Sequence, residues 1–331
     1  MLDWSALTDD EPVESLGAAD PEPPSQALIS PALWPWIGAA AVLAAALIAA
    51  LIALAVRGKK NRKRERGAVP AGTPPTRQLA QPMPPGAVPQ VGKLHQQGAR
   101  PGQQDCFSVS PADLAPGFGL LAVVADGMGG LADGDKVSQT AVAAMMNGFY
   151  AVQGRPEQVL LTLLGQANHE VNLLLGPDGC GNSGSTLVAG LVRDGKFHML
   201  SVGDSRVCLY RGGTLYQLNR EHIFFHELEL RSVNGEDSFQ NAYTHPKGAG
   251  LTSYLGMGKL KYVDMPAAPT DIQAGDKFLL MSDGVYNALT QAEIISCLNG
   301  SAEESAALLD QAIRAKNYSN QDNYTAVILG F

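Results

Sequence analysis

Hydrophobic and polar positions divide the chain into an uncharged apolar run, a proline-rich stretch and a long region of strand and helix patterns. Residues 32–56 contain no charged side chain and are rich in Ala, Leu and Ile. As a helix they would extend about 37 Å, enough to cross a bilayer with some tilt. Trp34 and Trp36 begin the run, where aromatic side chains favour the membrane interface. We therefore expect a transmembrane helix; the alternative is a buried core helix, which is seldom so long and uninterrupted.

The segments on either side of this run have opposite charge. Residues 1–31 contain acids and no Lys or Arg, and their composition predicts a disordered tail or, as an alternative, a sensor. Residues 57–66 carry seven basic side chains and one acid. By the positive-inside rule the basic flank is cytoplasmic, so the tail lies outside and the rest of the chain inside the cell. A cleaved signal peptide is the alternative, but its basic residues would precede the apolar run.

Residues 67–92 are rich in Pro, Ala, Gly and Gln, so residues 57–92 are predicted to be a basic juxtamembrane run followed by a linker. Residues 93–331 then form one domain, long enough for a large core. The four cysteines show no metal-ligand spacing and are expected to be reduced core residues. The formal net charge of the chain is −8, which disfavours nucleic acid as a partner.

Within this domain, short apolar or alternating runs predict strands, and longer periodic runs predict helices. Helices are expected from Asp133, from Pro156 to Gly176, and after capping boxes at Thr290 and Ser301. Strands are expected at 106–110, 118–125, 186–192, 196–202, 206–210, 215–218, 277–281 and 324–330, and residues 219–262 are read as loop with short helix. This order predicts an α+β fold in which two packed, mainly antiparallel β-sheets are flanked by helices.

Acidic residues recur at the ends of these strands. Asp126 follows a buried run in the stretch Asp126-Gly127-Met128-Gly129-Gly130, and an isolated Asp-Gly at a strand end would predict a plain turn. Four more acids occupy similar positions: Asp105, Asp204, Asp283 and Asp322. Converging carboxylates repel one another unless cations hold them together. Oxygen-only ligands favour Mg²⁺ or Mn²⁺, and two such ions can activate a water for attack on phosphorus.

In order and spacing these motifs resemble the metal-dependent protein phosphatases of the 2C (PPM) type, in their bacterial form. The resemblance extends over residues 93–331 and implies a serine/threonine protein phosphatase that attacks phosphoserine or phosphothreonine directly with a metal-bridging water. It rests on Asp126 to Gly130, Gly203-Asp204-Ser205-Arg206, Ser282-Asp283-Gly284 and Asp322-Asn323, with Arg100, Asp105, His245-Pro246, Leu251-Thr252 and Leu255-Gly256 in support.

The resemblance also implies roles for individual residues. Asp126 would bridge two Mn²⁺ or Mg²⁺ ions, joined by the Gly127 carbonyl, and Arg100 would bind the substrate phosphate. Asp283 and Asp322 would complete the first metal site, Asp105 would support the second, and Asp204 with Asp283 would offer a third, weaker site. The implied partners are phosphorylated proteins, including a serine/threonine kinase at the same membrane.

Three positions depart from the family pattern. Gln103-Gln104 precedes Asp105 where the family usually has Asn-Glu, so the second metal site lacks one acid. Met128 stands where eukaryotic members have a His, and residues 219–245 lack the usual acidic segment. Two other functions stay open: a catalytically silent relative that binds phosphoproteins, and a hydrolase of small phosphate esters.

Overall fold

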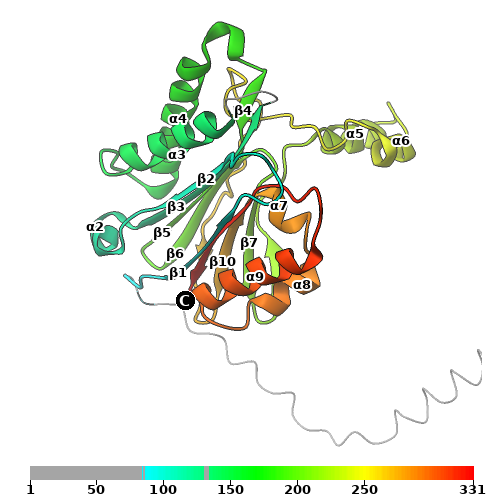
Figure 1. Ribbon diagram of the computed structural model, residues 1–331. Helices are drawn as coiled ribbons and strands as arrows, with labels where there is room; N and C mark the ends of the chain where they lie inside the picture. The colour runs from blue at the N-terminus through cyan, green and yellow to red at the C-terminus, as the bar shows by residue number, and fades with distance from the viewer. Residues whose placement is uncertain (1–83, 85, 130–133) are drawn as a thin grey trace, which may run out of the picture. The chain divides into compact units, whose positions relative to one another are not determined.

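The computed structural model describes residues 84, 86–129 and 134–331, which form an α+β unit (Figure 1). The expected tail at 1–31, the expected transmembrane helix at 32–56 and most of the linker at 57–92 lie outside these described residues, as do Gly130 and Asp133. Within the described part of the chain, no helix combines the length and apolar character that a membrane span requires.

Two antiparallel sheets form the centre of the unit, which confirms the α+β expectation (Figure 1). The first sheet has the order β1 (Gln90–Gln96), β11 (Tyr324–Gly330), β10 (Lys277–Met281), β7 (Arg206–Arg211) and β8 (Thr214–Gln217). The second has the order β2 (Asp105–Val109), β3 (Leu120–Gly129), β5 (Leu187–Arg193), β6 (Lys196–Val202) and β9 (Thr270–Asp271), and β4 (Ser183–Ser185) pairs with the end of β3.

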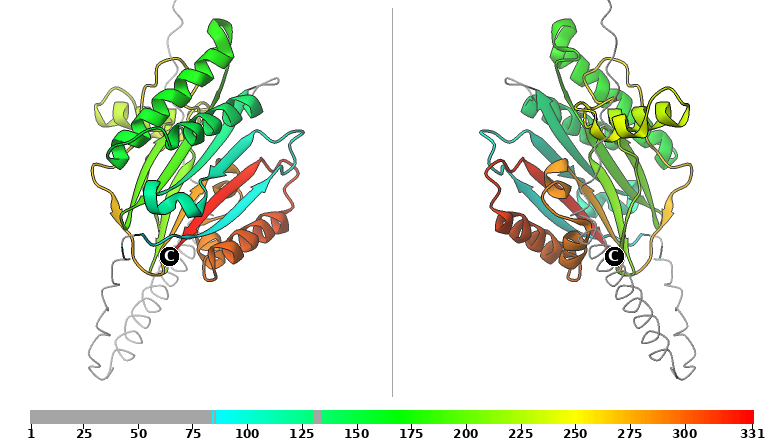
Figure 2. Two further views of the ribbon diagram at one scale, coloured as in Figure 1. Left: turned by 90° about the vertical axis from the view of Figure 1, so that its left-hand side faces the viewer. Right: turned by 90° about the vertical axis from the view of Figure 1, so that its right-hand side faces the viewer.

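Helices cover the outer face of each sheet (Figures 1 and 2). The second sheet packs against α3 (Gly134–Phe149) and α4 (Pro156–Gly179), and the first packs against α8 (Gln291–Cys297) and α9 (Ala302–Lys316). The short elements are η2 (Ala112–Leu114), α2 (Ala115–Phe118) and α7 (Asp283–Tyr286). Both predicted capping boxes are present, at the start of α8 and of α9.

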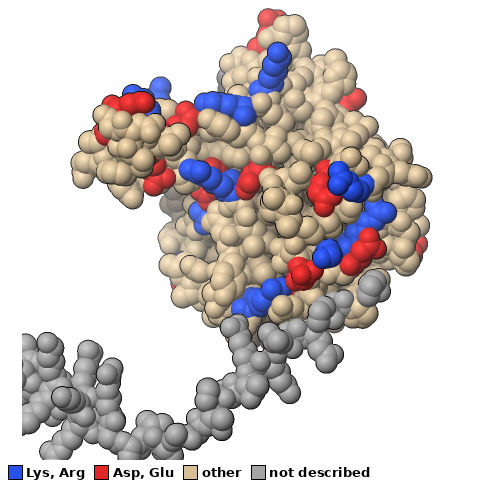
Figure 3. Space-filling view, turned by 180° about the vertical axis from the view of Figure 1, so that it is seen from behind, with Lys and Arg blue, Asp and Glu red and all other residues tan. Residues whose placement is uncertain are grey.

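Residues 219–262 form an arm that contains α5 (Phe224–Val233) and α6 (Phe239–Thr244) and extends to one side of the sheets (Figure 1). The start of the arm is fixed beside the second sheet, because the His222 amide donates a hydrogen bond of 2.8 Å to the carbonyl of Gly203, the residue that follows β6. Seen from behind, the unit presents basic and acidic side chains interspersed over the sheets and the arm (Figure 3).

The core between the two sheets is apolar and tightly packed. Phe197 of β6 stacks on Phe278 of β10 with ring centroids 3.9 Å apart. Gly190 of β5 makes room for this pair, since a Cβ there would lie 2.6 Å from the Phe197 ring. Full burial of one such side chain contributes about 1.5–3 kcal/mol, so the sheets provide a rigid base for the residues at their ends.

Two element boundaries differ from the sequence-based expectation. The strand expected at 118–125 begins at Leu120 and continues through Asp126 to Gly129, because β4 pairs with its last three residues. The expectation that the strand ends before Asp126 is therefore wrong. The folded part also begins earlier than residue 93, since β1 starts at Gln90 and pairs with β11 along its whole length.

A candidate active site at the sheet ends

The five aspartates singled out by sequence lie at the same end of the two sheets. Asp105 begins β2 and stands directly opposite Asp126 in the antiparallel register with β3. The others lie between β6 and β7 (Asp204), at the start of α7 directly after β10 (Asp283) and two residues before β11 (Asp322). The pKa of the half-buried Asp126 carboxyl is raised well above its usual range by loss of contact with water and then by the charges of these other four aspartates.

Asp105 is the most informative of the five. Its side chain is only 5% exposed, and Oδ2 accepts a 2.7 Å hydrogen bond from Ser282 Oγ. Oδ1 is buried and has no hydrogen-bond partner. Burial, with a smaller contribution from Asp283 and Asp322, raises the pKa of Asp105 to about 6. A buried carboxylate oxygen without a partner is costly, so this atom points to a ligand that the protein is built to receive.

The backbone around Asp126 is fixed by its neighbours. The Asp126 amide donates to Thr186 Oγ1 (3.1 Å), and its carbonyl accepts hydrogen bonds from Ser185 Oγ (3.0 Å) and the Thr186 amide (2.9 Å). Gly127 is required here, because a Cβ would lie 2.0 Å from the Gly134 carbonyl oxygen. The start of α3 thus lies directly against the strand that carries Asp126.

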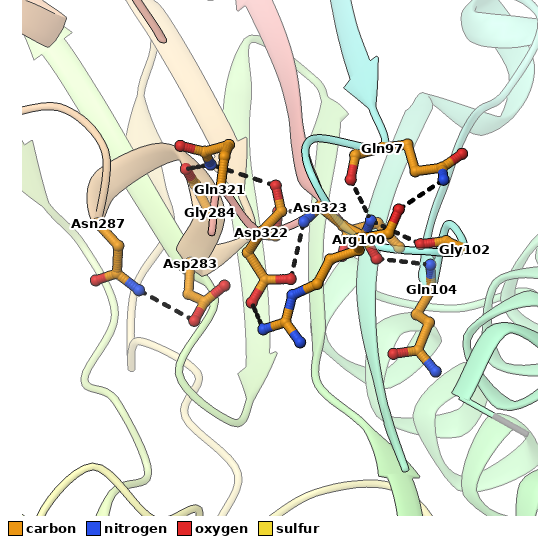
Figure 4. A network of polar contacts seen from close by, with 12 residues as sticks. Gln97, Arg100, Gly102, Gln104, Asp283, Gly284, Asn287, Gln321, Asp322 and Asn323 are labelled. Carbon is orange, nitrogen blue, oxygen red and sulfur yellow. Dashed lines mark hydrogen bonds and ion pairs between the residues drawn. The ribbon is translucent and has the colours of Figure 1, made fainter. Parts of the chain in front are cut away.

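Arg100 and Asp322 are brought together from distant parts of the chain (Figure 4). Arg100 Nη2 lies 2.5 Å from Asp322 Oδ2, and the Asn323 amide donates to Asp322 Oδ1 at 2.8 Å, so both oxygens of this carboxylate have partners. The ion pair is open to solvent, with the Arg100 side chain 54% exposed and that of Asp322 38%. The predicted phosphate-binding residue therefore lies at the rim of the acid cluster, within reach of a ligand from solution.

The side chain of Asn323 connects this rim to the loop that precedes β2 (Figure 4). Its Nδ2 group donates to the carbonyl oxygens of Gln97 (2.7 Å) and Gly102 (2.9 Å), and its Oδ1 accepts from the Gln104 amide (2.8 Å). The sequence indicated Asn323 only as a part of a motif and gave it no role.

Asp204 belongs to the same site, and a separate group of side chains surrounds it. Burial, followed by the charges of Asp283 and Glu221, raises its pKa to about 7. Tyr286 of α7 donates to the Asp204 carbonyl at 3.1 Å, and the Arg206 guanidinium lies 3.6 Å above the Tyr286 ring while pairing with Glu221. Tyr286 and Glu221 are residues that sequence reasoning missed, because neither belongs to a recognisable motif.

Gln103 and Gln104, which differ from the family pattern, both make hydrogen bonds that hold the backbone of the site. Gln103 Oε1 accepts a 3.0 Å hydrogen bond from the Asp105 amide. The Gln104 carbonyl accepts from the Gly127 amide (3.1 Å) and from Ser138 Oγ (2.6 Å), so it joins β3 and α3. Both residues therefore orient the backbone on either side of the acid pair.

The donor set suits a hard divalent cation, although no ready-made cluster exists. Among the described residues, no three His, Cys, Asp or Glu side chains are grouped closely enough to hold a metal ion as they stand. The unpaired Asp105 oxygen and the raised pKa values of Asp105, Asp126, Asp204 and Asp283 nevertheless show carboxylates that repel one another, and a bound divalent cation would relieve that repulsion. The residues present fit Mg²⁺ or Mn²⁺.

Comparison with known proteins agrees with this fold and site. Residues 91–320 match the family model described as protein phosphatase 2C. The serine/threonine phosphatase stp of Listeria innocua is 30% identical over 215 residues, which are 63% of this chain and 83% of that protein. The serine/threonine protein phosphatase PstP of Mycobacterium tuberculosis is 29% identical over 63% of this chain, but only over 40% of its own longer chain.

Solved structures show the same architecture. The PPM Ser-Thr phosphatase MsPP of Mycobacterium smegmatis, in complex with cacodylate, has a TM-score of 0.60 and 30% identity, covering 74% of this chain and 100% of that one. The catalytic domain of PstP in complex with two manganese ions has a TM-score of 0.57 and 26% identity, covering 73% and 98%. The chain belongs to the protein phosphatase 2C family. It is a protein serine/threonine phosphatase, as its relatives are.

Proposed function

We propose that this chain hydrolyses phosphoserine and phosphothreonine in proteins at a two-metal centre formed by the aspartates at the sheet ends. The observation that carries the proposal is the antiparallel pair Asp105–Asp126, in which a buried carboxylate oxygen has no protein partner while four other carboxylates raise the pKa of Asp126. The solved PstP domain with two manganese ions supports two Mn²⁺ or Mg²⁺ sites here.

The metal ligands are assigned from the position of each acid. Asp126 would bridge the two ions with help from the Gly127 carbonyl, Asp283 and Asp322 would serve the first ion, and Asp105 the second. Asp204, with Asp283, would offer a third and weaker site. When bound, the ions supply an activated water and neutralise charge on the phosphoryl group.

Arg100 is assigned to the substrate phosphate. Its guanidinium has five donors in a planar fork, of which Nη2 holds Asp322, so donors remain for phosphate oxygens. The pair with Asp322 also keeps the guanidinium beside the acids before substrate arrives, which reduces the ordering cost of binding. Met128 has no proton to transfer, so solvent water supplies the proton for the departing Ser or Thr oxygen.

The test is hydrolysis by the full-length chain, with and without Mn²⁺, of a phosphothreonine peptide and of a small aryl phosphate. Mn²⁺-dependent turnover of the peptide, more efficient than that of the ester, is expected. A protein that binds the phosphopeptide without turnover would instead be a silent binding module. Preference for the small ester would make it a hydrolase of small phosphates.

Membrane attachment is a second part of the proposal and rests on sequence alone. Residues 32–56 would span the membrane with residues 1–31 outside, and the basic residues at 57–66 would keep the phosphatase domain in the cytoplasm. Such an enzyme would act on phosphoproteins at the inner face, including a membrane-associated serine/threonine kinase. Protease added to intact cells should spare the domain and digest it after lysis; digestion in intact cells would reverse the topology.

A further inference from the structure

The loop of residues 97–104 carries Arg100 and leads directly to Asp105. It contains two glycines and a proline, and Gly98 adopts a positive φ of 64°. A Cβ at Gly98 would lie 2.3 Å from the Asp322 carbonyl oxygen, so the loop lies directly against the segment that precedes β11. A loop of this composition does not keep one conformation without contacts from outside itself.

One buried side chain makes three of those contacts, beside the 2.8 Å hydrogen bond that the Ala99 amide donates to the Gln321 carbonyl. Asn323 is 4% exposed, and its amide group meets the loop at three points: the carbonyl oxygens of Gln97 and Gly102 and the amide of Gln104. These points lie on both sides of Arg100. Gln97 adds a further contact, since its Nε2 donates to the Arg100 carbonyl at 2.7 Å.

The chemistry of this contact requires an amide. Two N–H donors must reach two carbonyl oxygens while one oxygen accepts from a backbone N–H, and an Asn side chain presents this combination. An Asp of the same shape would keep the acceptor but turn an oxygen toward both carbonyls. A Leu of similar size would leave these three partly buried backbone groups without this partner, which is costly.

We propose that Asn323 is a positioning residue for phosphate recognition: its side-chain amide fixes the 97–104 loop so that the Arg100 guanidinium is held at the rim of the acid cluster. This inference rests on the proposed function, because it takes Arg100 as the phosphate-binding group. Asn323 acts through Arg100 and touches neither substrate nor metal. Its backbone amide, which donates to Asp322 Oδ1, supports the partner of Arg100 from the other side.

The first measurement is hydrogen exchange of the 97–104 amides in the full-length protein without substrate. Asn323→Leu should raise exchange throughout the loop, whereas Asn323→Asp should leave the Gln104 amide protected because its acceptor remains. The matched control is Asn219→Leu, since Asn219 is also buried (6% exposed) and bonds to Ser201 of β6, to Val207 of β7 and to Ser205 between these strands. This control should lower the unfolding temperature and leave exchange at 97–104 unchanged.

The second measurement is a double-mutant cycle with Arg100→Ala, read as kcat/KM for a phosphothreonine peptide. Asn323→Leu should lower kcat/KM about 10- to 100-fold in the parent background, mainly through KM. In the Arg100→Ala background the same change should have an effect of about twofold or less, because the group that it positions is gone. If Asn323→Leu does not fold, Gln97→Ala replaces it in both measurements, because Gln97 is exposed and also bonds to the loop. The expected losses of exchange protection and of kcat/KM are then smaller.

The outcomes separate the two proposals. Two results would overturn the role of Asn323 while the phosphatase activity stands. One is unchanged exchange at 97–104. The other is a double variant whose loss of kcat/KM equals the product of the two single losses, which would mean that the residues act independently. If the parent protein shows no phosphopeptide turnover, the proposed function fails, and loop exchange alone then decides whether Asn323 fixes the loop.

Discussion

The acid cluster has a buried side and an exposed side, and the two balance charge differently. On the buried side, Asp105 and Asp126 face each other across a strand pair, and one Asp105 oxygen has no hydrogen-bond partner. On the exposed side, both oxygens of Asp322 already have partners, in Arg100 and the Asn323 amide. The buried side thus has an oxygen left for a ligand, whereas on the exposed side Asp322 already pairs with the residue assigned to the substrate phosphate. A metal ion at Asp322 would therefore share that carboxylate with Arg100.

The largest effect is expected from neutralising the buried side. Asp126→Asn should remove Mn²⁺-dependent hydrolysis, because Asp126 is the carboxylate that we propose as the bridge between the two ions. The same change should raise the unfolding temperature of the metal-free protein, since a carboxylate repelled by four neighbours becomes a neutral amide. Activity assays and thermal unfolding in EDTA measure both. Retained turnover would contradict the metal assignment, and a lower unfolding temperature would contradict the repulsion.

Removal of the Arg100 guanidinium on the exposed side should have a smaller effect. Arg100→Ala should lower kcat/KM for a phosphopeptide about 10- to 150-fold, as expected for loss of a charged hydrogen bond of about 1.5–3 kcal/mol. Arg100→Lys should recover only part of this loss, because an ammonium cannot bond phosphate and Asp322 as a planar fork does. Full recovery with Lys would mean that only charge matters at this position.

The buried side also predicts how stability depends on pH. In the folded protein without metal, the pKa values of Asp105 and Asp204 are raised to about 6 and about 7, above the ordinary aspartate pKa of 3.8 that applies in the unfolded chain. Between these limits the folded state binds more protons, so the free energy of unfolding falls as pH rises. The unfolding temperature in EDTA should drop by about 10 °C from pH 5 to pH 7.5. Mn²⁺ should raise it most at the upper pH, and Asp105→Asn should flatten the EDTA curve.

The smallest effect is expected where the acid missing from the family pattern is restored. Gln104→Glu keeps the backbone contacts of residue 104 with Gly127 and Asn323 and adds one carboxylate. The Mn²⁺ concentration for half-maximal activity should fall by less than about tenfold, which is below the roughly 10- to 100-fold effect of losing a residue that supports a metal ligand. Gln103→Glu is the matched control, since Gln103 is occupied with the Asp105 amide. An equal gain from both changes would indicate a general effect of negative charge.

Strongly periodic segments could be predicted from sequence, and weakly patterned ones could not. Strands β6, β10 and β11 and the helices with capping boxes follow from apolar runs and caps. Strand β1 lacks such a pattern because α9 approaches so closely that a Cβ at Gly92 would lie 1.9 Å from the Ala302 carbonyl oxygen. The last part of β3 was missed because its partner β4 consists of Ser and Gly alone.

For the site, strand ends identified the five acids, but their partners required the fold. The ion pair between Arg100 and Asp322 joins residues 222 positions apart, and the Asn323 contacts with the 97–104 loop are similarly distant. No local pattern encodes such contacts, because they depend on β1 and β11 lying side by side. The same holds for Tyr286, whose hydroxyl reaches Asp204 from another element.

The pairing of β1 with β11 determines at which points the domain can be attached to something else without covering the aspartates. Gln90 pairs with Gly330 at one end of these strands, while Gln96 pairs with Tyr324, next to Asp322, at the other. At about 3.3 Å per residue, the two ends are about 20 Å apart. Gln90 and Phe331, the C-terminal residue marked in Figure 1, therefore lie at the end of these strands away from Asp322. An anchor, tag or solid support attached at either place leaves the acid end facing freely into solution, where a bulky protein can approach it.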